Sequence, residues 1–182
     1  GGYKNTTWQE YIIYRNDFNQ QRYAEDIAGQ ISADNNEEFI WEAADKTSTI
    51  RSTRNNNKTL VVDLIDTSLK TAEEQLNYGK TAYLNGNNGL LKLQGDINQG
   101  AGGLYFNGNY TVSGKNANTT WTGAGISVAA GKQVNWQIRN NDILSKIGSG
   151  TLHVNGTGKN DGKISVGNGT VILNQKADEN GN

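Results

Sequence analysis

Short β-forming runs recur through residues 79–182, with glycine and asparagine corners between them. Strands this short, repeated at close intervals with no long helix between them, are typical of repetitive all-β folds. Nine runs carry the pattern: residues 82–84, 90–93, 104–106, 110–112, 126–128, 134–138, 151–154, 163–166 and 171–173.

Alternate residues of these runs are apolar and are expected to point inward. They include Leu91, Leu93, Leu104, Phe106, Leu152, Val154, Val171 and Leu173. One turn of chain cannot enclose them, so neighbouring turns must stack. We therefore predict an all-β fold, a right-handed parallel β-helix (solenoid) with coils of about 20–25 residues and asparagine amides stacked at its corners. A β-sandwich remains the alternative, although its strands would run about five or six residues.

Composition agrees with this prediction. The chain has no proline, 23 glycines and 26 asparagines, which suits backbone amides engaged in ladders and corners that need positive φ. Cysteine is absent, which excludes disulfides, thiolate zinc sites and a cysteine nucleophile. Methionine is also absent, so we expect a processed product or a cut fragment of a longer protein.

The first part of the chain has a different pattern. Residues 11–14 predict a short strand, and Asn16 could cap a helix over residues 17–28 that Gly29 ends. Three further strands are predicted, at residues 39–41, 47–53 and 60–64, with a turn at residues 55–57. We divide the chain into residues 1–31, a junction with short strands at 32–78, and the first coils of the solenoid at 79–182.

No complete catalytic, cofactor or metal site is predicted. The single histidine, His153, should point outward opposite Leu152 and Val154, and no GxSxG-like nucleophile segment accompanies it. The remaining candidates are interpreted as structure: adjacent or scattered acids as solvated surface, residues 100–103 as a corner and the tryptophans as packing residues. The acids are Glu37, Glu38, Glu73, Glu74, Asp96, Asp142, Asp161 and Asp178, and the tryptophans are Trp8, Trp41, Trp121 and Trp136.

Charge and hydropathy exclude other partners. The chain has 17 basic and 18 acidic residues, whereas nucleic acid and anionic membranes favour a basic surplus. No apolar run approaches the roughly 18 residues of a membrane-spanning helix. We therefore expect neither nucleic acid nor membrane contact by this segment.

Four stretches carry a resemblance to a known family. They read GAGGLYFNGNYTV at 100–112, TTWTGAG at 119–125, KIGSGTLHV at 146–154 and VGNGTVIL at 166–173. They resemble the passenger region of serine protease autotransporters, and the immunoglobulin A protease branch of Gram-negative bacteria such as Haemophilus and Neisseria looks most similar. The start of the chain, at residues 2–4, 7–10 and 13–14, is similar to the stretch that closes that family's protease domain.

The resemblance implies a place within a longer protein. Residues 1–31 would end a trypsin-like domain, and the rest would be the first coils of a β-helical stalk, with more stalk downstream. The parent would be a secreted or surface-bound serine endopeptidase that acts on a host protein and is exported through the periplasm and outer membrane. The family's catalytic residues match no position here, so the resemblance implies no catalytic residue in this chain.

Three functions follow as hypotheses. The first is a stalk that presents the protease and is not itself catalytic. The second is an adhesin-type β-helix that binds a host protein or glycan. The third is a β-helical polysaccharide-degrading enzyme, which would need clustered acids and basic residues in one groove.

Overall fold

The structure is a computed structural model that describes residues 27–65, 79–155 and 160–174. Within these ranges every regular element is a strand. Consequently, this part of the chain has no helix long and apolar enough to cross a membrane. Residues 11–14 and most of the predicted helix over residues 17–28 lie outside the described ranges.

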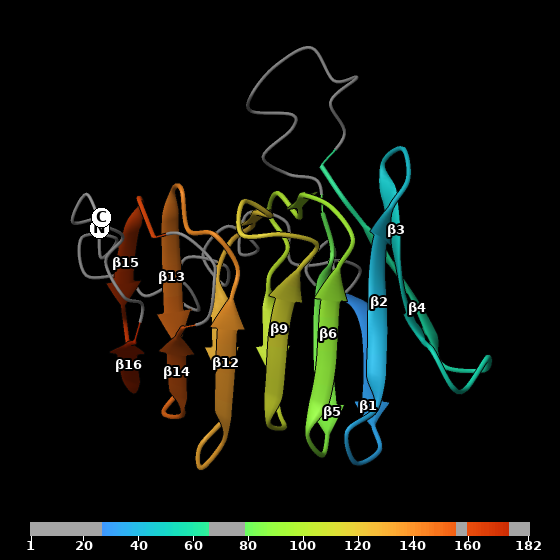
Figure 1. Cartoon of the computed structure of the whole chain (residues 1–182), viewed down its shortest axis with the longest axis horizontal. Helices are drawn as coiled ribbons and strands as arrows, with labels where there is room; N and C mark the ends of the chain where they lie inside the picture. The colour runs from blue at the N-terminus through green and yellow to red at the C-terminus, as the bar shows by residue number, and fades with distance from the viewer. Residues whose placement is uncertain (1–26, 66–78, 156–159, 175–182) are drawn as a thin grey trace.

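Two sheets run along the long axis of the molecule (Figure 1). Every strand pair in the first, sheet A, is parallel. In order across the sheet its strands are β1 (Ile27–Ala33), β5 (Thr81–Gly86), β8 (Leu104–Phe106), β11 (Ile126–Val128), β13 (Ile143–Ile147) and β15 (Lys163–Val166).

Sheet B lies opposite and takes the next strand of each coil. Its parallel part consists of β2 (Glu38–Ala43), β6 (Gly89–Leu93), β9 (Tyr110–Gly114), β12 (Gln133–Gln137), β14 (Thr151–Val154) and β16 (Thr170–Leu173). An antiparallel hairpin of β3 (Thr47–Ser52) and β4 (Thr59–Asp63) extends it beyond β2.

A shorter third side returns each coil from sheet B to sheet A. It contains the parallel pair β7 (Ile97–Asn98) and β10 (Trp121–Thr122), followed by parallel bridges at Thr120–Arg139 and Asn140–Asn160. Each coil therefore passes through sheet A, sheet B and this return side before it stacks on the next. This is a parallel β-solenoid, as the sequence predicts.

Strand register sets the length of each coil. Leu104 pairs with Ile126, 22 residues later, and Trp136 pairs with Val154, 18 residues later. The first coil is longer because it contains the hairpin: Trp41 pairs with Leu93, 52 residues later. Strands that the sequence placed in the junction thus belong to the same sheets as the later coils, while the division into three regions stays a prediction.

Alternate side chains of both sheets fill one continuous core. Leu84, Leu104, Phe106 and Ile126 from sheet A are fully buried, and so are most inward residues of sheet B. A buried Leu, Ile, Val or Phe contributes about 1.5–3 kcal/mol relative to its exposed state. Since neither sheet could bury these side chains alone, stacking of the coils provides the enclosure.

The β3–β4 hairpin closes the core at its N-terminal end. Leu60, Val62 and Leu64 join the buried cluster, and the backbone amide of Lys80 donates to the carbonyl of Asp63 at 2.9 Å. The end of β4 thus crosses from sheet B toward β5. The opposite end has no such cover among the described residues, because Val166 and Leu173 occupy inward positions yet are 48% and 60% exposed.

One predicted element is wrong where the structure describes it. Ile27, Ala28 and Gly29 belong to β1 and pair with β5, so the predicted helix does not continue through residue 28 and Gly29 does not end it. Gly29 has φ 139° and faces the Leu60 side chain of the hairpin. The glycine is therefore a strand position that makes room for the cap.

Candidate functional site

His153 points away from the core, as predicted. Leu152 and Val154 beside it are fully buried, and its Nε2 lies 2.8 Å from Oε1 of Gln133. In register, His153 pairs with Asn135 on one side and Ile172 on the other. Neither neighbour is an acid or a nucleophile, so the histidine has no triad partner in these strands.

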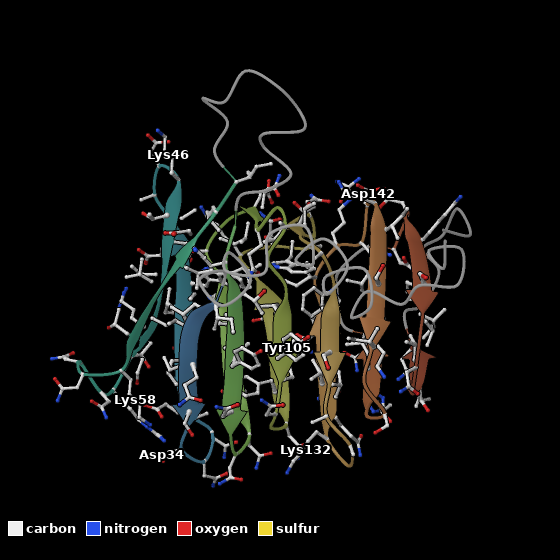
Figure 2. All side chains as sticks on the ribbon, turned by 180° about the vertical axis from the view of Figure 1, so that it is seen from behind. Asp34, Lys46, Lys58, Tyr105, Lys132 and Asp142 are labelled. Carbon is white, nitrogen blue, oxygen red and sulfur yellow. The ribbon has the colours of Figure 1, made fainter. Side chains whose placement is uncertain are left out.

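Glu37 forms the most strongly organised charged group. Its carboxylate accepts hydrogen bonds from the Asp34 amide at 2.9 Å, the Lys58 ammonium at 2.7 Å and the Ser52 hydroxyl. Burial raises the pKa of Glu37, but the bonds from Lys58, Ser52 and Asp34 outweigh it and lower the pKa to about 2. The same ammonium also reaches Asp34 at 3.3 Å (Figure 2), and Glu37 raises the pKa of Lys58.

This network corrects the prediction that Glu37 is solvated surface. Its side chain is 1% exposed, while the adjacent Glu38 is exposed as predicted. The carboxylate joins the corner before β2 to the loop between β3 and β4. Its role is therefore to hold the hairpin cap, and its low pKa leaves it unsuited to proton transfer near neutral pH.

Lys146 is a second buried charge, and sequence reasoning missed it. Its side chain is fully buried, and its ammonium donates to the carbonyls of Gly148 at 2.7 Å, Asn168 at 2.9 Å and Gly150. Burial lowers the pKa of Lys146. Because Asn168 belongs to the next coil, the ammonium links two successive corners.

The other acidic candidates are dispersed along the return side. Asp161 forms an ion pair with Arg139 at 2.7 Å, and Asp96 accepts from the Thr120 amide at 2.9 Å. Asp142 is exposed. Among the described residues no three His, Cys, Asp or Glu side chains gather as metal ligands would; Glu73, Glu74 and Asp178 lie outside those residues.

The corner at residues 100–103 packs against a buried amide. The side chain of Gln99 donates to the carbonyls of Lys80 at 2.7 Å and Gly103 at 2.9 Å, and it accepts from Trp121 Nε1 at 2.9 Å. These bonds of Gln99 are all made within the protein, as in a structural corner. A phosphate site would instead direct donor groups at the ligand.

Three tryptophans are packing residues, as predicted. Trp41 and Trp136 are 0% and 1% exposed, and Trp121 meets Trp136 edge to face with ring centroids 5.7 Å apart. Trp8 lies outside the described residues. No tryptophan in the described strands is available to line an open groove.

Amide side chains stack along the solenoid axis, as predicted. Asn85 donates to Gln30 at 3.0 Å, and Asn107 donates to Asn85 at 2.9 Å. On sheet B, Asn155 donates to Asn135 at 3.3 Å. These ladders bond coil to coil on the outside, as the core does on the inside.

Taken together, the charged and polar side chains described here hold coils together and do not converge on a reacting atom. In a strand, Lys146 lies on the same face as the apolar Leu144. This alternation was the one sequence pattern that could have predicted an inward lysine. Glu37 had a weaker signal, because nothing local shows that a loop 21 residues away supplies its cation.

The chain is similar over nearly its whole length to known proteins. No family model matches it. It is 46% identical to an immunoglobulin A1 protease autotransporter of Haemophilus influenzae over 181 residues, which is 98% of this chain and 10% of that protein. It is 45% identical to an IgA-specific serine endopeptidase autotransporter of Neisseria gonorrhoeae over 179 residues, 97% of this chain and 11% of that protein.

A solved structure has the same fold. The crystal structure of the Haemophilus influenzae Hap adhesin matches 91% of this chain and 20% of its own, with a TM-score of 0.78 and 36% identity. The chain spans about a tenth of the length of the curated relatives described above. The in-register parallel coils and these similarities together show that the chain belongs to the serine protease autotransporter family and is a segment of a passenger of the immunoglobulin A protease type.

Proposed function

We propose that this segment is a stalk that presents a serine endopeptidase domain and is not itself catalytic. The observation that carries the proposal is the continuous buried core that runs from β1 to β16. The two buried charged groups, Glu37 and Lys146, bond only to the hairpin and the corners that enclose this core. A scaffold needs such coil-to-coil bonding, whereas a hydrolase needs an acid, a base and a nucleophile in reach of one substrate.

The parent protein's activity is part of this proposal. The relatives are named as immunoglobulin A1 proteases and an IgA-specific endopeptidase. We infer that the longer protein cuts a host protein of that kind. We also infer that residues 1–31 end the protease domain, that further stalk follows, and that export through the periplasm and outer membrane brings the protein to the cell surface.

A segment exchange tests the stalk role directly. The matching segment of the Haemophilus influenzae immunoglobulin A1 protease is replaced by residues 1–182 of this chain. Because the coils supply support and not chemistry, the chimera should reach the cell surface and cleave immunoglobulin A1 within about threefold of the parent. The control chimera carries Trp136→Asp, which places an acid at a core position and should lower the surface yield at least tenfold.

Separate assays test the absence of catalysis. The purified chain should not react with a fluorophosphonate probe for activated serines, and it should leave immunoglobulin A1 intact. Covalent labelling or cleavage by the chain alone would contradict the proposal, as would a well-exported chimera that has lost its peptidase activity.

An adhesive role is the second candidate, and two observations favour it. The Hap adhesin shares the fold. In addition, the outer face of β9 and β12 carries hydroxyls at Thr111 and Ser113 and amides at Asn135 and Gln137, groups of the kind that hydrogen-bond a glycan or a peptide. Saturable binding of the purified chain to immobilised host matrix proteins, lost on Asn135→Lys, would establish this role; equal binding by the variant would reject this face.

A further inference from the structure

Asparagine–glycine pairs are chemically labile sites in a protein chain. The backbone nitrogen of the glycine can attack the side-chain amide of the asparagine, because glycine has no Cβ to obstruct the approach. The structure describes both residues of four such pairs: Asn85-Gly86, Asn88-Gly89, Asn107-Gly108 and Asn168-Gly169. The fold therefore decides which of these four pairs can react.

Three of the four pairs have their reacting groups engaged elsewhere. The carboxamides of Asn85 and Asn107 belong to the ladder along sheet A, in which Asn107 donates to Asn85 at 2.9 Å. After Asn88, the backbone amide of Gly89 donates to the carbonyl of Asn109 at 2.9 Å. A nitrogen or a carboxamide held by another coil must break that bond before it can react, so these pairs should be protected.

The fourth pair has its two reacting groups turned toward each other. The backbone amide of Gly169 donates to Oδ1 of Asn168, with 2.7 Å between nitrogen and oxygen. Because a C=O bond is about 1.23 Å long, Cγ of Asn168 lies about 3.0–3.5 Å from that nitrogen, a separation suited to bond formation. Asn168 is exposed, so water and hydroxide can reach the pair.

Lys146 makes the Gly169 amide more reactive. Its ammonium donates to the carbonyl oxygen of Asn168 at 2.9 Å, and this oxygen belongs to the same peptide group as the Gly169 nitrogen. When the nitrogen loses its proton, the negative charge is shared with that oxygen. An ammonium bonded to the oxygen therefore stabilises the nucleophilic form. Lys146 is fully buried, where water screens its charge least.

The same corner requires glycine at position 169. Gly169 has φ 71°, which other residues rarely adopt. A Cβ there would overlap Nζ of Lys146 and the carbonyl oxygens of Gly148 and Gly150. The arrangement that surrounds the ammonium thus keeps the residue after Asn168 small and leaves the approach to its side chain open.

We propose that Asn168–Gly169 is a self-modification site at which the folded chain deamidates, with Lys146 activating the Gly169 amide. The Gly169 nitrogen gives its proton to hydroxide and bonds to Asn168 Cγ. The bond from Cγ to the side-chain nitrogen then breaks, and that nitrogen takes a proton from water and leaves as ammonia. Water opens the resulting succinimide at Cγ to give aspartate, or at the backbone carbonyl to give isoaspartate. The net change replaces NH₂ by OH.

Both products alter the link between two successive coils. Aspartate adds a negative charge to the residue whose carbonyl binds Lys146. Isoaspartate lengthens the backbone between β15 and β16 by one carbon and displaces that carbonyl from the ammonium. Deamidation would therefore change this corner as the protein ages, whether or not the segment serves as a stalk.

Incubation of the full chain at neutral pH, followed by peptide mass spectrometry, measures the mass gain at each pair. The other three described pairs are controls within the same sample, and a second sample in guanidinium chloride removes the fold. In the folded chain Asn168 should deamidate about tenfold faster than Asn85, Asn88 or Asn107. In denaturant the four rates should agree within about threefold, because only local sequence then acts. Equal rates in the folded chain, or a slower rate at Asn168 when folded than when denatured, would overturn the proposal.

Two variants test the part given to Lys146. Lys146→Met removes the ammonium, whereas Leu144→Ala opens a cavity in the same strand and leaves the ammonium in place. With both variants folded by circular dichroism, the rate at Asn168 should fall about fivefold in Lys146→Met and stay within about twofold in Leu144→Ala. Equal falls would show that Lys146 acts through stability alone. An unchanged rate in Lys146→Met would show that the ammonium does not activate the amide, and either result would overturn this part.

Discussion

Buried charges at two corners are the residue-scale feature that gives this solenoid its local order. Glu37 and Lys146 are 1% and 0% exposed, yet each has several hydrogen-bond partners at a corner between sheets A and B. A buried charge without partners costs several kcal/mol. The fold therefore keeps each corner in the conformation that supplies the hydrogen-bond partners of its charge. Each residue therefore holds its corner in place, and a substitution that removes the charge should lower the free energy of unfolding.

The Glu37 carboxylate should stabilise the fold in a pH-dependent way. Glu37→Gln keeps the shape but removes the charge that accepts from Lys58, and we expect a loss of about 2 kcal/mol at pH 7. Because the folded pKa of about 2 lies below the ordinary glutamate value of 4.5, the contribution is present above pH 4.5 and is lost as the pH falls toward 2. Urea unfolding at pH 7 and pH 3 should therefore show a smaller difference between the two proteins at pH 3.

Glu42→Gln is the matched control for that experiment. Glu42 pairs with Arg51 at 3.2 Å, but both side chains are 49% exposed, so its loss should cost less than about 1 kcal/mol. Equal effects of the two substitutions, or a difference for Glu37→Gln that does not change with pH, would contradict the role given to Glu37.

Removal of the Lys146 ammonium should leave three carbonyls without their donor. Lys146→Met keeps most of the side-chain volume, and we expect it to lower the free energy of unfolding by about 3 kcal/mol. Lys115→Met, at an exposed position, should change it by less than about 0.5 kcal/mol. Chemical denaturation at neutral pH measures both, and an unchanged midpoint for Lys146→Met would show that the carbonyls do not depend on the ammonium.

At the scale of elements, the short strands could be predicted because their alternation is clear. Residues 110–112 alternate apolar and polar side chains, residues 104–106 are all large apolar or aromatic ones, and both runs are strands. β13 was missed because Lys146 occupies an inward position and breaks the apolar pattern. β1 was missed because helical spacing before Ile27 and a glycine at residue 29 mimic a helix end, while the pairing partner that makes it a strand lies 54 residues away in β5.

The structural role of Glu37 could not be predicted from the local sequence. That role depends on Lys58, which the β3–β4 hairpin brings to Glu37 from 21 residues away. Spacing along the chain carries no information on such contacts. The outward direction of His153, by contrast, follows from two neighbours and was predicted.

A tight approach of two adjacent coils gives an element-scale prediction. Gly89 of β6 pairs with Tyr110 of β9, and a Cβ at Gly89 would overlap the tyrosine ring, whose hydroxyl donates to the Asn85 carbonyl at 2.6 Å. Gly89→Ala should therefore displace the ring and lower stability by about 2 kcal/mol. Gly95→Ala, where no atom lies within 4 Å, should have little effect.

A double variant checks the cause of that loss. Tyr110→Leu removes both the ring and its hydrogen bond, so Gly89→Ala should cost much less in the Tyr110→Leu background than alone. Additive effects in urea unfolding would show that the glycine acts through its backbone and not through contact with the tyrosine.

Within the part of the chain that the structure describes, the solenoid core is covered at one end and exposed at the other. The hairpin covers the core before β1, but inward positions of the last coil, Val166 and Leu173, are 48% and 60% exposed. Exposed apolar residues beside unpaired strand edges favour association. The exposed inward positions of the last coil support the proposal that further stalk coils follow β16.

We expect the isolated chain to self-associate through that open end. The double variant Val166→Lys/Leu173→Lys should shift the chain toward the monomer, because charged side chains at a strand edge oppose its pairing with a second copy. Sedimentation velocity over a concentration series measures the change, and Val61→Lys, at an exposed position of β4, is the control at the capped end. A chain that is monomeric throughout, or that responds equally to the control, would contradict this expectation.

The central claim is that successive coils stack in register and form one rigid scaffold. Leu90, Thr111, Asn135, His153 and Ile172 form a single outward column across sheet B. Spin labels at Leu90→Cys and Ile172→Cys, four strand spacings apart, should give a narrow distance distribution near about 20 Å, widened only by the label linkers. A broad distribution, or a distance beyond about 35 Å, would show that the coils do not stack in this register and would contradict the account.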